Sequence, residues 1–167
     1  MKIYLLRHAK AEIGFPDSGR NLSELGRTDA GRLGSFLRER GGIQLQNVWT
    51  SPLLRAQETA NIFLQALQPE GNKEWVEQPE DLLEPERDPR PLIESIRELD
   101  QDLLLVGHNP NLETLFSLLI SGERYRARIH LKTCVLVCLE WLPWLGEQQT
   151  GPCVLQWLLD PRLIAAE

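Results

Sequence analysis

The segment Ile3-Tyr4-Leu5-Leu6-Arg7-His8 places four apolar residues directly before a cation and an imidazole. A short apolar run of this kind is typical of a strand that is buried on both faces of a parallel sheet. The pattern returns at residues 103–108, where Leu103-Leu104-Leu105-Val106 is followed by Gly107-His108. A further short strand is expected at Asn47 to Thr50. These three strands are the framework on which the remaining elements are placed.

Helical segments are expected between and after these strands. Ser23 is expected to cap a helix that runs to about Arg40. Ser51-Pro52 and Asn109-Pro110 each combine a capping residue with a proline, which predicts that a helix begins at each of these points. Apolar residues at helical spacing predict another helix over residues 92–99.

The C-terminal third of the chain differs from the rest. Leu131 to Trp141 and Cys153 to Leu159 are expected to be strands, joined by a turn region that contains proline and glycine. The polar, proline-rich stretch from Gln68 to Pro91 is expected to be irregular. The alternation of strands and helices before Leu131 predicts a three-layer α/β/α sandwich with a mostly parallel central sheet. A length of 167 residues suits a single domain over residues 1–167.

The composition limits the classes of protein to which the chain can belong. Hydrophobic residues make up 42% and charged residues 25%, which excludes general disorder. A net charge of −6 disfavours nucleic acid and anionic membranes as partners. We find no signal-peptide core and no apolar window of about 18 residues, so we expect a cytoplasmic protein. Reduced thiols are expected at the three cysteines, which form no CxxC pair: Cys134, Cys138 and Cys153.

Cationic or reactive residues follow each of the three expected parallel strands. These are Arg7-His8, then Ser51-Pro52 with Arg55 shortly after it, and finally Gly107-His108. Because ligands of open parallel sheets bind at the carboxyl ends of the strands, these side chains are expected to converge. Two guanidinium groups, two imidazoles and two helix N-termini form an anion site, for which a phosphoryl group is the natural ligand. Metal-assisted nucleotide chemistry is not expected, since the sequence has neither a Walker-type glycine run nor a carboxylate cluster for Mg²⁺.

Three of these segments resemble the motifs of the histidine phosphatase superfamily (branch 1), which is also called the phosphoglycerate mutase-like family. Leu6-Arg7-His8-Ala9 is similar to its Arg-His-Gly motif, with alanine in place of glycine. Residues 51–60 resemble its S-P-x-x-R-A-x-x-T-A motif, and Gly107-His108-Asn109-Pro110 resembles its third motif. Arg20-Asn21-Leu22-Ser23-x-x-Gly26 is similar to the R-x-L-[ST]-x-x-G segment of the short SixA-type phosphohistidine phosphatases. The resemblance spans residues 3 to about 120.

The resemblance implies a phosphoglycerate mutase-like fold and a mechanism that needs no metal or other cofactor. His8 would be the nucleophile and would form a covalent phosphohistidine. Arg7, Arg55 and His108 would bind the phosphoryl oxygens and stabilise the charge of the transfer. Arg20 would add a phosphate contact, with an ordinary salt bridge in the loop as the alternative. From the chemistry, His8 must be neutral on its attacking nitrogen, and we expect a backbone carbonyl to hold its other N–H.

A general acid for the leaving group is expected in the segment after the second helix, where many family members carry a carboxylate. Glu84 is our candidate and Asp81 is the second choice, although the SixA-type pattern has no reliable acid at this point. The alternative for Glu84 is a solvated loop carboxylate. Cleavage of a phosphorus–nitrogen bond to imidazole demands less help from an acid than cleavage of a phosphate ester.

The function favoured by the sequence is hydrolysis of phosphohistidine on a protein, with a phosphotransfer domain as the kind of partner. The short chain leaves little room for extra segments over the pocket, which suits a phosphorylated side chain on a protein surface. The alternatives are a small-molecule phosphomonoesterase or mutase of the same superfamily, and a non-catalytic phosphoprotein-binding module. The basic stretch from Arg124 to Lys132 is expected to be a solvated edge or to meet an acidic partner protein. The sequence is compatible with a monomer.

Overall fold

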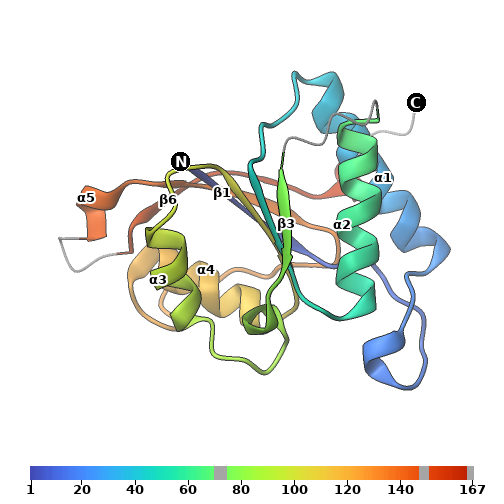
Figure 1. Cartoon of the computed structure of the whole chain (residues 1–167), viewed down its shortest axis with the longest axis horizontal. Helices are drawn as coiled ribbons and strands as arrows, with labels where there is room; N and C mark the ends of the chain where they lie inside the picture. The colour runs from blue at the N-terminus through green and yellow to red at the C-terminus, as the bar shows by residue number, and fades with distance from the viewer. Residues whose placement is uncertain (70–74, 147–150, 165–167) are drawn as a thin grey trace.

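The computed structural model describes residues 1–69, 75–146 and 151–164, and within these residues it contains one six-stranded sheet (Figure 1). The strand order is β3-β2-β4-β1-β5-β6. The strands are β1 Lys2–Arg7, β2 Asn47–Thr50, β3 Val76–Pro79, β4 Leu103–Gly107, β5 Leu136–Trp141 and β6 Cys153–Leu159. Strands β3, β2, β4 and β1 pair in parallel, whereas β5 and β6 are antiparallel to their neighbours. The prediction of a mostly parallel sheet is therefore confirmed.

Helices cover both faces of this sheet and complete the three layers. The helices are α1 Glu24–Glu39, α2 Leu54–Leu67, α3 Arg90–Arg97, α4 Asn111–Ser121 and the short α5 Pro143–Gly146. Three 3₁₀ turns lie between them: η1 Asp17–Gly19, η2 Asp81–Leu83 and η3 Pro161–Leu163. Helices α1 and α2 lie against one face, and α3 and α4 lie on the other (Figure 1). No helix among the described residues is long and apolar enough to cross a membrane.

The central strands are continuously apolar because both of their faces are buried. In β1, Tyr4 and Leu6 pack in the core under α1 and α2, while Ile3 and Leu5 pack in the core under α3 and α4. All four residues are buried. Successive side chains of a strand point to opposite faces, so a strand between two helical layers needs apolar residues at every position.

Helix α1 begins and packs as its sequence indicates. The Ser23 hydroxyl accepts a hydrogen bond from the backbone N–H of Gly26 at 3.1 Å, which confirms the predicted cap. Gly26 lies so close to the loop after β1 that a Cβ atom there would be 2.1 Å from the carbonyl oxygen of Lys10. Glycine at this position therefore lets the first turn of α1 pack against the segment that follows β1.

Two strand predictions needed correction. Strand β3 lies within the stretch that was expected to be irregular, and its four residues are all exposed, so no apolar pattern marks it. Strand β5 begins at Leu136 rather than at Leu131. The backbone turns before it, since Cys134 has a φ of 63°, and the carbonyl of Leu131 binds the side chain of Arg7 instead of a neighbouring strand. Part of the predicted turn region between β5 and β6 lies outside the described residues.

Both proline-marked helix starts also shifted. Helix α2 begins at Leu54, with Leu53 at the N-cap, so Ser51 does not cap it. Helix α4 begins at Asn111, with Pro110 at the N-cap. The capping side chains that the sequence suggested serve another purpose, because both Ser51 and Asn109 bind residues of the site described below.

Candidate active site

The candidate site lies at the carboxyl ends of β1, β2 and β4. Arg7 pairs with Gly107 at the ends of β1 and β4, and the backbone N–H of His8 donates to the carbonyl oxygen of Gly107 at 2.9 Å. The backbone N–H of Ser51 donates to the carbonyl oxygen of Val106, also at 2.9 Å. The three loops that carry the predicted site residues therefore start side by side, as expected for an open parallel sheet.

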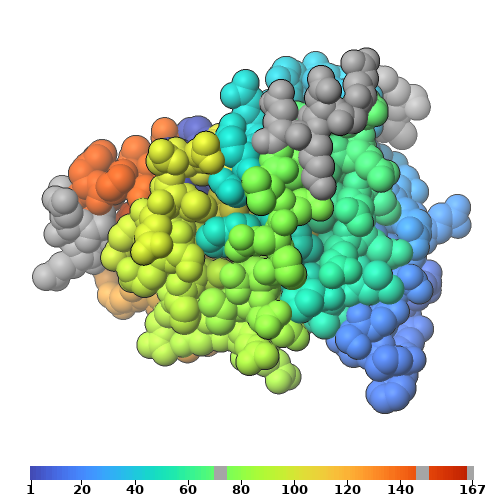
Figure 2. All heavy atoms as spheres, in the orientation of Figure 1, coloured from blue at the N-terminus to red at the C-terminus, as the bar shows by residue number. Residues whose placement is uncertain are grey.

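Two further segments flank this edge of the sheet. Figure 2 shows residues 11–20 in blue and residues 80–90 in yellow-green, which project on the two sides of a notch in the lower part of the view. The first segment follows the predicted nucleophile, and the second carries the predicted general acid.

The ring of His8 is held in one tautomer. Its Nδ1 lies 2.7 Å from the carbonyl oxygen of Ala9. A carbonyl can only accept, so Nδ1 must carry the proton when the ring is neutral, and Nε2 is left with a free electron pair. Burial, and then the charges of Arg55 and Arg7, lower the pKa of His8 to about 4. His8 is therefore an unprotonated imidazole at neutral pH, as the sequence argument required.

His108 lies beside His8, with their ring centroids 4.9 Å apart. It is buried, and burial together with the nearby His8 and Arg55 lowers its pKa to about 3. Its Nε2 is 2.8 Å from the hydroxyl of Ser51. Among the described residues its buried Nδ1 has no hydrogen-bond partner. An unpaired buried polar atom of this kind calls for an explanation, and a ligand oxygen would supply one.

Arg55 is a buried cation that contacts the loop of residues 11–20. Its Nη1 donates to the backbone carbonyl of Asp17 at 2.8 Å, and its Nη2 is 3.0 Å from the Asp17 carboxylate. The Asp17 side chain is 63% exposed, whereas that of Arg55 is 5% exposed. A guanidinium fork matches the oxygens of a carboxylate and of a phosphoryl group equally well. Asp17 therefore occupies a position on Arg55 that an anionic ligand would use.

Arg20 lies in the same loop and binds the same carboxylate. Its Nη1 is 2.8 Å from Asp17, and its Nε donates to the carbonyl oxygen of Glu12 at 2.7 Å. The salt bridge that was the alternative for Arg20 is therefore present in this structure. Arg20 also lies close enough to His8 for its charge to help lower the pKa of that imidazole. A phosphate contact of Arg20 stays a prediction.

Arg7 is fixed from the other side of the site. Its Nη1 donates to the carbonyl oxygen of Leu131 at 2.6 Å, and the side-chain amide of Asn109 donates to the same oxygen at 2.8 Å. The backbone N–H of Leu131 in turn donates to the carboxylate of Glu113 at 2.9 Å. In the described residues the buried Nε of Arg7 has no partner. Arg7 is thus held in place through Nη1, and its buried Nε–H is available to a ligand.

Thr59, in α2, connects His8 and Arg55 in the interior. Its hydroxyl accepts from the backbone N–H of Ala9 at 2.9 Å and donates to the backbone carbonyl of Arg55 at 2.6 Å. Thr59 is fully buried. The threonine of the S-P-x-x-R-A-x-x-T-A segment therefore fixes the turn after His8 against the helix that carries Arg55.

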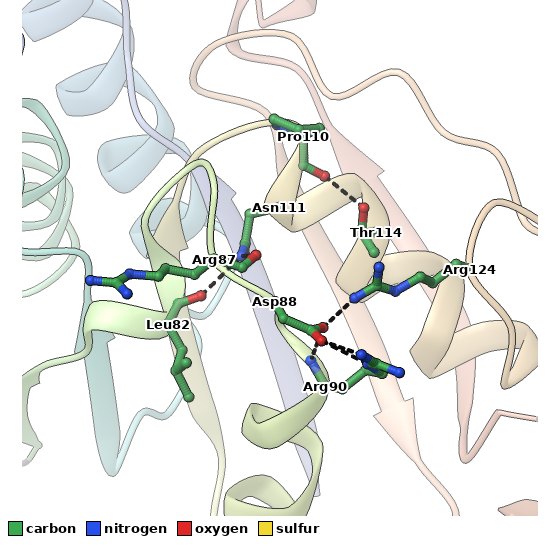
Figure 3. Close-up of polar contacts among 8 residues, drawn as sticks. All are labelled: Leu82, Arg87, Asp88, Arg90, Pro110, Asn111, Thr114 and Arg124. Atoms are coloured by element: carbon green, nitrogen blue, oxygen red, sulfur yellow. Dashed lines mark hydrogen bonds and ion pairs between the residues drawn. The ribbon is translucent and has the colours of Figure 1, made fainter.

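The segment that carries Glu84 is attached to the site by backbone contacts. The side-chain amide of Asn111, at the start of α4, donates to the carbonyls of Leu82 and Arg87 at 2.9 Å each (Figure 3). Turn η2 packs against the end of β4, because a Cβ atom on Gly107 would lie 3.0 Å from the carbonyl oxygen of Leu83. The segment that carries Glu84 is therefore held against Gly107, the residue directly before His108.

Neither candidate acid contacts the two imidazoles of the site within the described residues. Glu84 follows η2 and lies 3.6 Å from the guanidinium of Arg87, while the exposed Asp81 lies within the turn. No contact joins either carboxylate to His8 or His108 in the described ranges. The acid role of Glu84, with Asp81 as second choice, stays a prediction. No group of three or more potential metal ligands occurs among residues 1–69, 75–146 and 151–164.

Three contributors were missed by the sequence argument. Ser51 and Thr59 lie within the recognised motif, so the signal was present, but Ser51 was interpreted only as a helix cap. Asp17 had no signal, because its contact with Arg55 depends on how the loop folds back over 38 residues of sequence separation. Taken together, the candidate site places the neutral imidazole of His8 beside Arg7, Arg55 and His108, and Arg7 and His108 each have a buried nitrogen without a partner among the described residues.

Comparisons with known proteins identify the family and the fold. The model of the histidine phosphatase superfamily (branch 1) matches residues 3–86, which is half of the chain. No curated protein matches the sequence significantly. The matched residues run from β1 through η2, and so they include the nucleophile loop and the arginine of α2.

Several solved structures share the fold across nearly the whole chain. The protein histidine phosphatase SixA in complex with tungstate aligns with a TM-score of 0.81 and 20% identity, covering 97% of this chain and 98% of its own. A SixA from Agrobacterium tumefaciens, described as a candidate phosphohistidine phosphatase, aligns with a TM-score of 0.74 and 22% identity over 96% and 97%. A mycobacterial glucosyl-3-phosphoglycerate phosphatase in complex with VO3 aligns with a TM-score of 0.68 and 17% identity over 93% and 97%. These similarities confirm the predicted phosphoglycerate mutase-like fold.

Proposed function

The chain belongs to the histidine phosphatase superfamily (branch 1), and from this premise we propose that it hydrolyses phosphohistidine on a protein through a covalent intermediate on His8. Membership of the family supports a phosphatase. The protein substrate, the covalent step and the independence from metal ions are the parts that we propose. The observation that carries the proposal is the free Nε2 of His8, which is neutral and lies next to Arg7, Arg55 and His108.

In the first step, Nε2 of His8 attacks the phosphorus atom of the substrate. The bond from phosphorus to the substrate's imidazole nitrogen breaks, and its electron pair stays on that nitrogen, which takes up a proton. The hydrogen bond from Nδ1 to the carbonyl of Ala9 stabilises the positive charge that develops on the His8 ring. The product of this step is a phosphoryl group on His8 and a free histidine side chain on the substrate protein.

The second step returns the protein to its starting state. A water molecule attacks the phosphorus atom, the bond to Nε2 breaks, and inorganic phosphate leaves with the neutral imidazole restored. In both steps Arg7 and Arg55 offset the charge of the equatorial oxygens. When the Ser51 hydroxyl donates to Nε2 of His108, Nδ1 of that ring carries the proton and donates to a phosphoryl oxygen.

The phosphoryl group must compete with Asp17 for Arg55. The Asp17 carboxylate is largely exposed, and its loop projects from the body of the molecule, so the carboxylate can turn toward solvent when the ligand arrives (Figure 2). The phosphoryl oxygens would replace the carboxylate on the guanidinium, so the buried charge of Arg55 would not be left without a partner. Asp17 therefore shields the buried cation in the empty site without closing the site.

The leaving group distinguishes the proposed substrate from the alternative. Imidazole accepts a proton readily, whereas an alkoxide needs a general acid, which is the role that we assign to Glu84. A small-molecule phosphomonoesterase is the second candidate function, since one of the structurally similar proteins is a glucosyl-3-phosphoglycerate phosphatase. A protein that turns over alkyl esters would need Glu84 much more than one that turns over phosphohistidine.

The test compares substrate classes in the presence of EDTA. The wild-type protein is incubated with a phosphotransfer domain phosphorylated on histidine and, separately, with a panel of small alkyl and aryl phosphates. We expect the highest kcat/KM on the phosphotransfer domain. A higher kcat/KM on a small ester would favour the phosphomonoesterase, and binding without turnover of any substrate would favour the non-catalytic module.

A further inference from the structure

We propose that a groove between the start of α4 and the loop of residues 123–131 docks an acidic segment of the phosphorylated partner protein. This loop is called the basic loop below. The inference rests on the proposed function, because it requires that the substrate be a protein. It assigns a binding role to a surface outside the catalytic groups and explains the cationic stretch that the catalytic mechanism does not use.

The groove is a cavity of about 280 Å³ that is open to solvent. Pro110 and Thr114 line one wall, and Tyr125, Arg128 and Ile129 line the other. The hydroxyl of Thr114 is turned to the carbonyl of Pro110, to which it donates at 3.0 Å (Figure 3). Most of this lining is apolar, with a guanidinium at its edge, so the groove suits an apolar side chain flanked by a carboxylate.

The groove adjoins the catalytic groups. Pro110 is two residues after His108, so its Cα lies within about 8 Å of that residue's Cα. The basic loop ends at Leu131, whose carbonyl oxygen accepts hydrogen bonds from Arg7 at 2.6 Å and from Asn109 at 2.8 Å. A protein segment that occupies the groove therefore lies next to the site where its phosphohistidine would react.

The basic loop is built as a rigid element. The buried hydroxyl of Ser117 donates to the carbonyl of Glu123 at 2.7 Å and accepts from the N–H of Ala127 at 3.0 Å. The guanidinium of Arg124 pairs with Asp88, at the start of α3 (Figure 3). A loop that is already ordered loses little conformational entropy when a partner binds.

Within this loop, Tyr125 adopts a conformation that only a functional or structural demand would maintain. Its φ is 64°, in the left-handed region that a bulky residue rarely occupies, and its side chain is 67% exposed. Burial does not account for this strain, because the ring gains little contact with the protein. Tyrosine and arginine are the residues most often responsible for the binding energy of protein interfaces.

The charge of the groove selects an acidic partner. The basic loop contains three arginines, Arg124, Arg126 and Arg128, and one carboxylate, Glu123, in a chain whose net charge is −6. Arg124 and Arg126 are paired with Asp88 and Glu123, whereas Arg128 has no ion-pair partner in the part of the chain that the structure describes. The carboxylate on the groove wall, Glu113, accepts hydrogen bonds from Asn109 and Leu131 and also lies 3.6 Å from the ring of His130. Arg128 is therefore the cation available to an incoming carboxylate.

The experiment measures docking and turnover separately. An unphosphorylated phosphotransfer domain is used for the binding measurement, because it leaves out the contribution of the phosphoryl group. It is titrated against the His8→Ala variant, and against the same variant that also carries Arg128→Glu or Tyr125→Ala. We expect Kd to rise about 5- to 20-fold with Arg128→Glu and less with Tyr125→Ala. In the background with His8 intact, kcat/KM should fall by a similar factor on the phosphorylated domain and stay unchanged on a small aryl phosphate. Arg97→Glu, an exposed reversal of charge on α3, is the matched control.

Each outcome decides the proposal. An unchanged Kd for Arg128→Glu, an equal effect of Arg97→Glu, or an equal loss of activity on the aryl phosphate would overturn docking in the groove. A wild-type protein that hydrolyses small esters but not the phosphorylated domain would refute the proposed function, and the Kd values would then decide independently whether the groove binds the domain. Circular dichroism and the Tm of each variant show whether it is folded.

Discussion

The buried centre of the site and the loop of residues 11–20 are held in place by different kinds of contact. In the centre, His8, Thr59 and His108 are fixed by short hydrogen bonds to backbone or buried hydroxyl groups. The loop is joined to Arg55 through Asp17, by a hydrogen bond to the Asp17 backbone carbonyl and by an ion pair with its largely exposed carboxylate. Buried hydrogen bonds are costly to leave unmade, whereas exposed ion pairs contribute little.

This difference separates the part to which we assign the chemistry from a flanking loop that has few buried contacts. Ile13 and Phe15 in the loop are almost fully exposed, so little apolar contact stabilises it. Segments with few buried contacts open at low cost in free energy. The centre is therefore the more firmly held part of the candidate site, and the loop is the part expected to adjust when a ligand binds. Arg55 contacts both regions and is the first residue to test.

Replacement of Arg55 by alanine should cause the largest loss on phosphohistidine among the variants of the surrounding groups. The guanidinium would hold phosphoryl oxygens in every transition state, so kcat/KM should fall about 10²- to 10³-fold on phosphohistidine and on aryl phosphates alike. Steady-state kinetics on both substrates measures this, with the exposed Arg38→Ala as control. A loss confined to one class of substrate would contradict the assigned role.

Replacement of Glu84 by glutamine should have an effect that depends on the leaving group. A general acid commonly contributes about 10²- to 10⁴-fold, so an alkyl phosphate should lose roughly 10²-fold or more. Phosphohistidine and activated aryl phosphates should lose much less, because their leaving groups need less help from an acid. Rates are compared with those of Glu86→Gln, two residues away. Equal slowing of all substrates would exclude Glu84 as the acid and make Asp81 the next residue to test.

Replacement of Asp17 by asparagine should strengthen the binding of anions. The amide keeps the shape of the side chain but removes the charge that competes for Arg55, so the inhibition constant of vanadate should fall by up to about fivefold. Asp100→Asn, at an exposed position outside the site, controls for the change in net charge. Weaker inhibition in Asp17→Asn would mean that the carboxylate orients Arg55 for the ligand and does not compete with it.

The smallest expected effect is on the pH dependence of stability, which should reflect the burial of His8 in the centre of the site. The pKa of His8 is about 4 in the folded protein and about 6.5 in the unfolded chain, so the unfolded chain binds more protons between these values. The free energy of unfolding should therefore fall as the pH decreases from 6.5 to 4. Urea unfolding at several pH values should show a shallower fall for His8→Gln, and an identical slope would contradict the low pKa.

The sequence predicted the parts of this molecule that depend on local pattern. The buried strands were found because both faces of the sheet require apolar residues, as in the run from Ile3 to Leu6. Strand β3 was missed because it is an exposed edge strand whose pairing with β2 depends on backbone hydrogen bonds rather than on side chains. The start of β5 was misplaced because Leu131 is apolar and buried, yet its backbone binds Arg7 and Glu113.

In the candidate site, too, the residues that belong to a local motif were predictable and the others were not. His8, Arg55 and His108 lie in motifs with a fixed place after a strand or in the first turn of a helix, and the structure brings them together. Asp17 could not be found in this way, since its contact with Arg55 arises from the path of an exposed loop. Ser51 was misinterpreted for a similar reason. Its hydroxyl could cap a helix or bind an imidazole, and the choice between them depends on the tertiary structure.

The most direct test of the account is the chemical identity of the phosphorylated group during turnover. The wild-type protein and the His8→Ala variant are mixed with a phosphotransfer domain carrying radiolabelled phosphohistidine, quenched in base within the first turnovers, and separated from the substrate. We expect an acid-labile, base-stable phosphoryl group on the wild type, mapped by mass spectrometry to His8, and none on the variant. Equal labelling of both proteins, or rapid turnover by the variant without labelling, would contradict a covalent intermediate on His8.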